Sequence, residues 1–232
     1  MSARVVAFVH AKGSSERIPH KNLRVLGDRP LFTHAIAIAR AAASVGEVVI
    51  DSDCDEILRI GEEHGATPLR RPAWLASNEA TGDDLAIWQA SSRPQAEVVI
   101  QVIPTAPFLE PGSVDRAVAM LAEPGVHSVA AISSDSLYRW REGRPAYLTA
   151  EGRLPNSTEL EPTIWETTGL YANRAAIVRR IERRMDMAHC RGLLVSRLEA
   201  VDVNTPEDFA FAELLWKGLH AGAPLGPVAA SR

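Results

Sequence analysis

Short runs of apolar, β-branched residues recur along this chain, and each run ends in a polar loop. The first is Val5–Val9, the second is Val48–Ile50 and the third is Val98–Ile103. Runs this short and continuous are typical of strands buried on both faces of a parallel sheet. Helix-forming stretches separate them, so the alternation predicts a doubly wound α/β fold with a mainly parallel sheet between helical layers.

Cap and turn residues give approximate bounds to the other elements. The segment Asn204–Asp208 combines a polar cap, a proline at the first turn and early acids, which predicts the start of a helix. We expect the last strand just before it, at Leu198–Asp202. The remaining expected helices are 30–43, 55–64, 112–122 and 174–184, and the remaining expected strands are 126–132 and 170–172.

Three polar segments fall directly after predicted strands. They are 10–22, 51–53 and 104–107. In open α/β sheets ligands bind beyond the carboxyl ends of the strands. We therefore expect these three segments, distant in sequence, to converge on one site.

Residues 134–166 interrupt the alternation. They are rich in Arg, Tyr, Trp, Gly and Pro, with a turn signal at Glu142-Gly143. We interpret this segment as an extended hairpin arm that either covers the site or packs on a second subunit. With this arm included, the sequence predicts a single domain over 1–220, followed by a flexible tail at 221–232.

Composition excludes several classes of protein. The net charge of −4 leaves no global positive field for nucleic acid or anionic lipid, so any anion must be bound locally. Cys54 and Cys190 match no metal-ligand spacing, which predicts two reduced thiols. Residues 1–11 contain a short apolar run, but we expect no signal peptide there, because the run is not part of a charged-then-apolar leader of signal length. No apolar run approaches the ~20 residues that cross a bilayer. We expect a cytoplasmic protein that binds neither nucleic acid nor membrane.

The loop after the first strand carries the clearest chemical signal. Within ten residues it offers small residues whose backbone N–H groups can face phosphate oxygens, and several cations: Lys12, Gly13, Ser14, Ser15, Arg17 and Lys21. Its position after the first strand favours phosphate binding over the alternative of a solvated basic loop. The Walker pattern, the dinucleotide-binding Gly-x-Gly-x-x-Gly and the Gly-x-Ser-x-Gly elbow are absent, which disfavours ordinary NTPases, dehydrogenases and hydrolases.

The segment Ala11–Asn22 resembles the signature loop of the acylneuraminate cytidylyltransferase family, which activates sialic and related nonulosonic acids as CMP-sugars. Four more segments agree in order and spacing: Ser52-Asp53, Arg71–Ala76, Pro104–Pro107 and Val201–Phe209. The resemblance covers about 5–216, and Ala80–Gly82 and Pro104–Phe108 look closer to the pseudaminic acid branch. It implies a three-layer, Rossmann-like nucleotidyltransferase fold with a dimerisation arm, CTP as substrate and a homodimer.

The resemblance also implies residue roles. Lys21, Arg17 and Asp202 correspond to catalytic positions, with Lys21 stabilising transition-state charge. The implied nucleotide-binding residues are Lys12, Gly13, Ser14, Ser15, Asn22, Arg71, Ala80, Thr81 and Gly82. Without the resemblance, Arg71 reads equally well as a surface arginine that caps a turn.

A magnesium ion is the cofactor that the resemblance implies. Mg²⁺ needs only one or two carboxylates, because waters and phosphates complete its shell. Asp202 matches the family's metal-binding carboxylate. The family's second aspartate is Asn204 here, which offers an amide oxygen without charge. Without the resemblance, the favoured reading of Asp202 is an acid at a strand end that is hydrogen-bonded to the next loop.

The acceptor implied by the resemblance is a small, acidic, sugar-like molecule. Its predicted binding residues are Thr105, Glu166, Thr168 and Tyr171. Relatives that bind sialate have an arginine in the segment where Trp165 and Glu166 stand here. An ionised Glu166 would repel a carboxylate unless a base intervenes, and Arg139, Arg141 and Arg144 are the candidates.

Other departures from the family pattern leave alternatives open. Lys12 replaces an arginine, Glu16 a lysine and Ile103 a glutamine. The chain could use another acidic acceptor (Kdo-like or an antibiotic precursor), use UTP or GTP, or be a nucleotide-binding scaffold without catalysis. The arm's aromatic residues suit a dimer interface or sugar stacking, and we favour the interface: Tyr138, Trp140, Tyr147 and Trp165.

Overall fold

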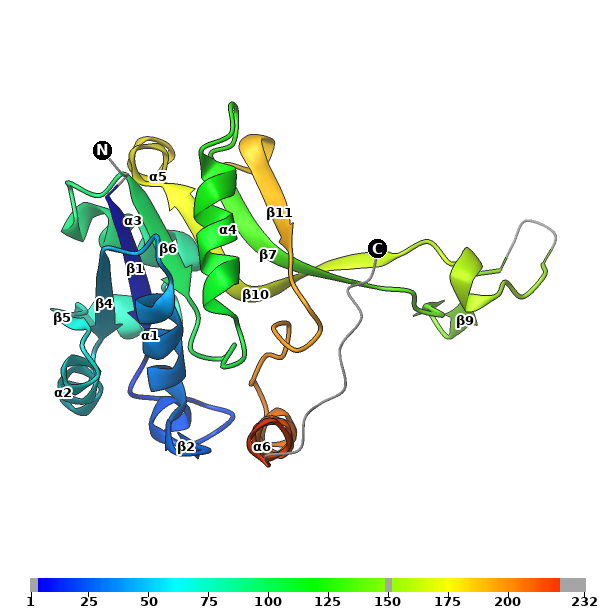
Figure 1. The fold of residues 1–232 in the computed structure, drawn as a ribbon, viewed down its shortest axis with the longest axis horizontal. Coiled ribbons are helices and arrows are strands. Elements are labelled where there is room, and N and C mark those ends of the chain that lie inside the picture. The colour runs from blue at the N-terminus through cyan, green and yellow to red at the C-terminus, as the bar shows by residue number, and fades with distance from the viewer. Residues whose placement is uncertain (1–3, 149–151, 222–232) are drawn as a thin grey trace.

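A seven-stranded sheet forms the centre of the molecule in a computed structural model that describes residues 4–148 and 152–221 (Figure 1). The strand order is β11-β7-β10-β6-β1-β4-β5. Only β10 among these runs antiparallel to its neighbours, so the prediction of a mainly parallel sheet is confirmed. The strands are β1 (Val5–His10), β4 (Glu47–Ser52), β5 (Thr67–Arg70), β6 (Val98–Val102), β7 (Ser128–Asp135), β10 (Thr163–Arg174) and β11 (Cys190–Leu194).

Helices cover both faces of the sheet. The alternation of β1 shows why: Val5, Ala7 and Val9 enter one apolar cluster, and Val6 and Phe8 enter another. The first cluster packs against α1 (Leu31–Ala41), α2 (Asp55–Glu63) and α4 (Pro111–Leu121). The second packs against α3 (Gly82–Ser92) and α5 (Ala175–Ile181). Two helical layers around one sheet give the three-layer architecture expected from the sequence.

The C-terminal helix α6 (Pro206–His220) closes the molecule beside a short ribbon of β2 (Val25–Leu26) and β3 (Arg29–Pro30). Phe209 and Ala212 of α6 are buried in a third apolar cluster with Leu26 and Ile18. The helix starts where the sequence predicts: the Thr205 side chain accepts from the Asp208 backbone N–H, and the Asp208 carboxylate accepts in return from Thr205. This capping box fixes the chain directly after Asp202.

The prediction of a last strand at Leu198–Asp202 is wrong. The last strand within the described residues is β11, and residues 197–200 form a turn. Ser196 and Glu199 close that turn reciprocally, with each side chain accepting from the backbone N–H of the other. The Glu199 carboxylate is buried and also accepts from Ser113 and from the backbone N–H of Glu110. These bonds outweigh the strand propensity of the sequence, so Asp202 lies in a loop and not at a strand end.

Residues between β7 and β10 leave the globular body as the predicted arm (Figure 1). The turn at Glu142-Gly143 joins β8 (Trp140–Arg141) to β9 (Arg144–Pro145), and both turn residues have positive φ. Beyond this hairpin, Thr163 pairs with Asp135, so the ends of β7 and β10 form the base of the arm. The predicted tail, apart from residue 221, lies outside the described residues.

Candidate active site

A pocket of about 570 Å³ opens at the carboxyl ends of β1 and β6. Most of the predicted nucleotide-binding residues line it: Lys12, Ser14, Ser15, Asn22, Arg71, Ala80, Thr81 and Gly82. The predicted catalytic Lys21 and acceptor residue Thr105 line it as well. Arg17 lines an adjoining pocket of about 320 Å³ together with Lys12 and Lys21. The loops after β1 and β6 therefore meet as the strand-end rule predicts.

The basic loop is held in shape by the segment after β4. The Gly13 backbone N–H donates to Asp53 Oδ1 at 3.0 Å, and a Cβ on Gly13 would lie 2.8 Å from the Cβ of Cys54. Only glycine allows this approach. Asn22 is buried and donates from Nδ2 to the Lys12 carbonyl at 2.8 Å. All three polar segments thus contribute to the site, and the loop is preorganised before any ligand arrives.

Lys21 and the segment around Asp202 lie side by side although 182 residues separate Lys21 from Val203. Lys21 Nζ donates to the Val203 carbonyl at 2.9 Å, and Arg17 Nη2 donates to Asn204 Oδ1 at 3.2 Å. Burial lowers the pKa of Lys21 below its ordinary value, while the nearby Asp202 carboxylate opposes that shift. The ammonium group is thus only partly solvated and lies close to both the loop and the acidic segment.

Asp202 has one carboxylate oxygen available. Its Oδ2 accepts from Asn204 Nδ2 and, at 3.3 Å, from Thr168 Oγ1. Its Oδ1 is buried and has no hydrogen-bond partner among the described residues. An unpartnered hard oxygen of this kind fits a magnesium ligand. The amide of Asn204 does not present its oxygen here, since Oδ1 accepts from Arg17 and Nδ2 faces Asp202. Its role as a metal ligand stays a prediction and requires the amide to turn.

Arg71 forms the base of the pocket through a buried ion pair. It is 4% exposed, with Nε 2.9 Å from Asp51 Oδ1 and Nη2 2.9 Å from the Asp51 carbonyl. The second carboxylate oxygen of Asp51 accepts from Gln89 Nε2, also at 2.9 Å. Both partners are therefore satisfied, as a buried charge pair requires. The alternative of a surface arginine is wrong, because the guanidinium is buried, lines the pocket and is held by Asp51.

Two pocket features were not predicted from the sequence. His10, at the end of β1, lines the pocket, and its Nδ1 has no hydrogen-bond partner in the described part of the chain. Burial, with the charges of Arg71 and Arg184, lowers the His10 pKa to about 3, so the ring is neutral at physiological pH. The second feature is α3, whose first residue, Gly82, lines the pocket. The pattern Thr81-x-x-Asp84, a capping box in the structure, was the signal for this helix.

The predicted acceptor residues on β10 gather at an irregularity of that strand. The pairing of β10 with β7 shifts between Glu166 and Tyr171, and Thr168 has a φ of +59°. This bend directs Thr168 toward Asp202, while Tyr171 donates from its hydroxyl to Glu166. Burial, reinforced by the Glu166 hydrogen bond, raises the pKa of the Tyr171 hydroxyl, which therefore stays protonated.

Arg184 is the cation beside this group. Its guanidinium carbon lies 4.0 Å from the centre of the Tyr171 ring, and its buried Nε has no hydrogen-bond partner among the described residues. Arg139, Arg141 and Arg144, the cations proposed from the sequence, lie instead on the exposed arm. Arg184 follows α5 and carried no motif, so only the tertiary structure could identify it.

Comparisons with known proteins identify the family of this chain. Residues 6–140 match the family model described as Cytidylyltransferase. The chain is 26% identical to CMP-N,N'-diacetyllegionaminic acid synthase of Legionella pneumophila, over 91% of this chain and 96% of that protein. It is 21% identical to pseudaminic acid cytidylyltransferase of Campylobacter jejuni, over 94% and 98% of the two chains.

Other similarities are narrower or more distant. The N-acylneuraminate cytidylyltransferase of Oncorhynchus mykiss is 27% identical over 60% of this chain, which spans 32% of that protein. Among solved structures, a CMP:2-keto-3-deoxy-manno-octonic acid synthetase complexed with CTP superposes with a TM-score of 0.70 at 14% identity, covering 94% of this chain and all of that one. The relatives confirm the resemblance found in the sequence, and the structural neighbour confirms the fold. Because the family model matches more than half of its length, this chain belongs to the cytidylyltransferase family.

Proposed function

We propose that this protein transfers CMP from CTP to the hydroxyl of an acidic, sugar-like acceptor of the nonulosonic acid type, with release of pyrophosphate. The observation that carries the proposal is that Lys21, which lines the pocket at the carboxyl edge of the sheet, and Arg17 both hydrogen-bond to the two residues that directly follow Asp202. Two relatives that match nearly the full chain are named for legionaminic and pseudaminic acid, which supports a nonulosonic acid as acceptor.

Each group of residues has a distinct task in this proposal. The backbone N–H groups and cations of loop 12–21 hold the triphosphate, and Arg71 supplies a fixed charge below it. The acceptor hydroxyl attacks the α-phosphorus and releases its proton to water or to the acceptor's own carboxylate. The bond between the α-phosphorus and the oxygen that bridges to the β-phosphorus breaks, and pyrophosphate leaves toward Lys21 and Arg17. Mg²⁺ bound at Asp202 would supply further charge neutralisation. Thr105, Thr168 and the Glu166–Tyr171 pair orient the acceptor.

A pyrophosphate-release assay tests the proposal. The protein is incubated with Mg²⁺, each of the four NTPs in turn, and a panel of nonulosonic acids, Kdo and neutral sugars. We expect release with CTP and a nonulosonic acid, and background release when either is omitted. Turnover with UTP or GTP in place of CTP would show that the proposed nucleotide is wrong. Turnover with Kdo in place of nonulosonic acids would show that the proposed acceptor is wrong. Tight CTP binding without turnover on any acceptor would identify a scaffold that has lost catalysis.

We also propose that the protein acts in the cytoplasm, where CTP is made and used. Within residues 4–148 and 152–221, no helix combines the length and the apolar character that a bilayer crossing requires. The pockets of the site are local and cationic while the net charge is negative, which suits a small anionic substrate over nucleic acid.

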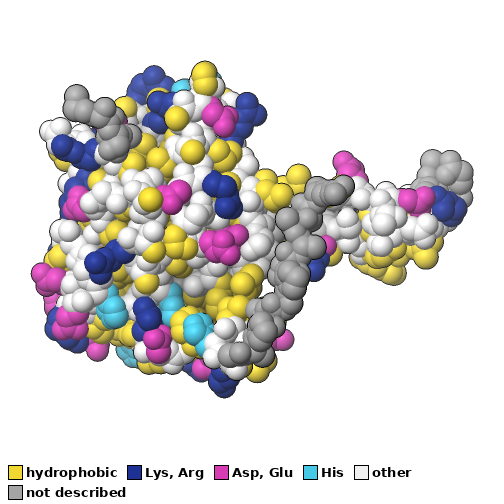
Figure 2. Space-filling view, viewed as in Figure 1, with side chains coloured by type: hydrophobic (Ala, Val, Ile, Leu, Met, Phe, Trp, Pro, Cys, Tyr) yellow, Lys and Arg dark blue, Asp and Glu magenta, His cyan; other side chains and the backbone are white. Residues whose placement is uncertain are grey.

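A homodimer formed through the arm is part of the proposal. The arm exposes several large apolar side chains, and Figure 2 shows apolar atoms along one side of it. Trp140 is 63% exposed at the hairpin, and Tyr138 packs edge-on against Tyr147 at 5.0 Å. Such aromatic groups are common in interface centres.

Trp140→Asp tests the dimer. We expect wild type to sediment as a dimer and the variant to shift toward monomer, because a charge in an apolar contact is costly to desolvate. Leu214→Asp on α6, where the side chain is 67% exposed, is the matched control and should remain dimeric. A monomeric wild type, or a variant that dimerises as tightly as wild type, would exclude the arm as the interface.

A further inference from the structure

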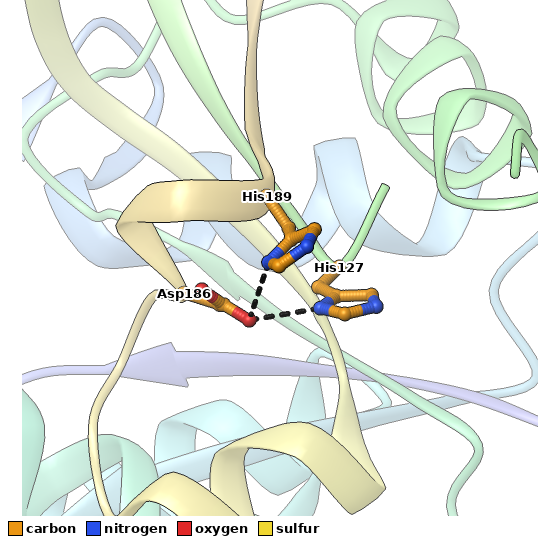
Figure 3. Close-up of side chains that lie close together, drawn as sticks. All are labelled: His127, Asp186 and His189. Carbon is orange, nitrogen blue, oxygen red and sulfur yellow. Dashed lines mark hydrogen bonds and ion pairs between the residues drawn. The ribbon is translucent and has the colours of Figure 1, made fainter. Parts of the chain in front are cut away.

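Two histidines and an aspartate form a compact cluster that the proposed reaction does not use. His127 Nδ1 lies 2.8 Å from Asp186 Oδ2, and His189 Nδ1 lies 3.1 Å from the same oxygen. Figure 3 shows the two rings approaching that carboxylate from the same side. Among the described residues, this is the one group of three or more His, Cys, Asp or Glu residues whose donor atoms all lie within 4.8 Å of one another.

The cluster lies where β7 and β11 begin. His127 immediately precedes β7, and His189 ends a short 3₁₀ helix (Met187–His189) that leads into β11. Since both strands run parallel to β1, these positions are at the edge of the sheet opposite to the carboxyl ends that carry the pocket. The cluster is therefore separate from the proposed magnesium ligand Asp202.

Backbone contacts hold the three side chains in place. The backbone N–H of His127 donates to the His189 carbonyl at 2.9 Å, and that of Asp186 donates to Ser128 Oγ at 2.9 Å. The two imidazole centroids are 4.3 Å apart. The donors thus come from two chain segments that are locked to each other, and they do not depend on the chance positions of long flexible side chains.

The donor set suits a borderline transition metal better than magnesium. Imidazole nitrogen with one carboxylate oxygen is a common combination for Zn²⁺ and related ions, whereas Mg²⁺ prefers oxygen alone. In a tetrahedral shell with bonds of about 2.0–2.1 Å, neighbouring donor atoms lie about 3.3 Å apart. The observed 2.8 and 3.1 Å separations are close to that value. The His189 side chain is 48% exposed, so water can complete the coordination.

The Asp186 carboxylate already faces both imidazoles. Its Oδ2 lies within hydrogen-bond distance of both Nδ1 atoms, so the donor atoms of the three residues point toward one another. The imidazoles would release their Nδ1 protons on binding a metal, as metal-ligating histidines do.

We propose that His127, Asp186 and His189 form a three-ligand site for a divalent transition ion of the zinc type, which fixes the segment 182–189 to the sheet.

The segment 182–189 also contacts the proposed active site. The Arg184 backbone N–H donates to Asp83 Oδ1 at 2.8 Å in the first turn of α3, the helix whose first residue lines the pocket. The Arg184 guanidinium packs on Tyr171. A bound ion would therefore stabilise the positions of Arg184 and the start of α3.

Metal titration of the protein without a polyhistidine tag tests this site. After chelator treatment and dialysis, Zn²⁺ is titrated calorimetrically and by thermal unfolding, and Co²⁺ is added separately to record its ligand-field spectrum. We expect one tight equivalent of Zn²⁺ per chain, a higher unfolding temperature with Zn²⁺, and a Co²⁺ spectrum that Zn²⁺ abolishes. Binding to the folded state alone produces such a thermal shift.

His189→Ala and Asp186→Asn are the test variants, and His64→Ala at the end of α2 is the control. We expect each test variant to weaken Zn²⁺ binding at least about tenfold, since even loss of a group outside the first shell has that effect. The control should bind as wild type does. Circular dichroism in chelator checks that the variants are folded. If wild type binds no tight equivalent of Zn²⁺, or if folded His189→Ala binds Zn²⁺ as wild type does, the three residues form only a hydrogen-bonded cluster and not a metal site. No readout uses CMP transfer, so this result is independent of the proposed reaction.

Discussion

Asp202→Asn is expected to lower CMP transfer by a factor on the order of 10³, because the proposed metal ligand would contribute several kcal/mol to charge stabilisation and each ~1.4 kcal/mol is tenfold in rate. The substitution keeps the size of the side chain and its ability to accept from Thr168. It removes the charge and alters the buried Oδ1 that has no partner in the described chain. The loss should therefore be in chemistry and not in folding.

The measurement is kcat at saturating CTP and acceptor over a range of Mg²⁺ concentrations. We expect the variant to need more Mg²⁺ for half its maximal rate, with an unchanged thermal unfolding midpoint in the absence of metal. Asp55→Asn is the control, since that carboxylate is 91% exposed in the first turn of α2. A folded Asp202→Asn enzyme that retains more than a tenth of wild-type kcat with the same Mg²⁺ dependence would remove Asp202 from the metal site.

The sequence was most informative where one local signal decided the structure. The runs at Val5–Val9 and Val98–Ile103 are typical of strands buried on both faces of a parallel sheet, and β1 and β6 form there. The start of α6 was equally clear, because cap, proline and acid all occur within five residues. Loop 10–22 could be assigned to the site for a topological reason: it follows the first central strand.

The sequence was misleading where contacts between distant residues determine the local structure. Segment 198–202 has strand propensity, but the buried Glu199 carboxylate holds a turn there through Ser113 and Ser196. Helix α3 escaped prediction because its buried positions are Ala86, Gln89 and Ala90, which form no strong apolar stripe. Arg184 contacts Tyr171 and Asp83 only after the sheet has formed. Long-range polar contacts of this kind leave no periodic trace in a sequence.

Lys21→Met is expected to lower kcat for CMP transfer by about 10²–10³, the usual loss when one group that stabilises transition-state charge is removed. Methionine keeps the apolar stem of the side chain but cannot donate to the Val203 carbonyl or neutralise a phosphate. Lys217→Met, in the last turn of α6, is the matched control and should leave kcat unchanged. A similar loss of kcat in both variants would indicate a general effect of charge.

The pH dependence separates a catalytic role of Lys21 from a structural one. Burial lowers its pKa below the ordinary 10.5, so the free enzyme loses this charge at a lower pH than exposed lysines do. In wild type, kcat/KM for CTP should therefore fall as pH rises through that lowered pKa, since this parameter reports ionisation in the free enzyme. The residual activity of Lys21→Met should lack that alkaline fall, because the variant has no proton to lose at this position. If the fall persists unchanged in Lys21→Met, another group titrates, and Lys21 only holds the loop against Val203.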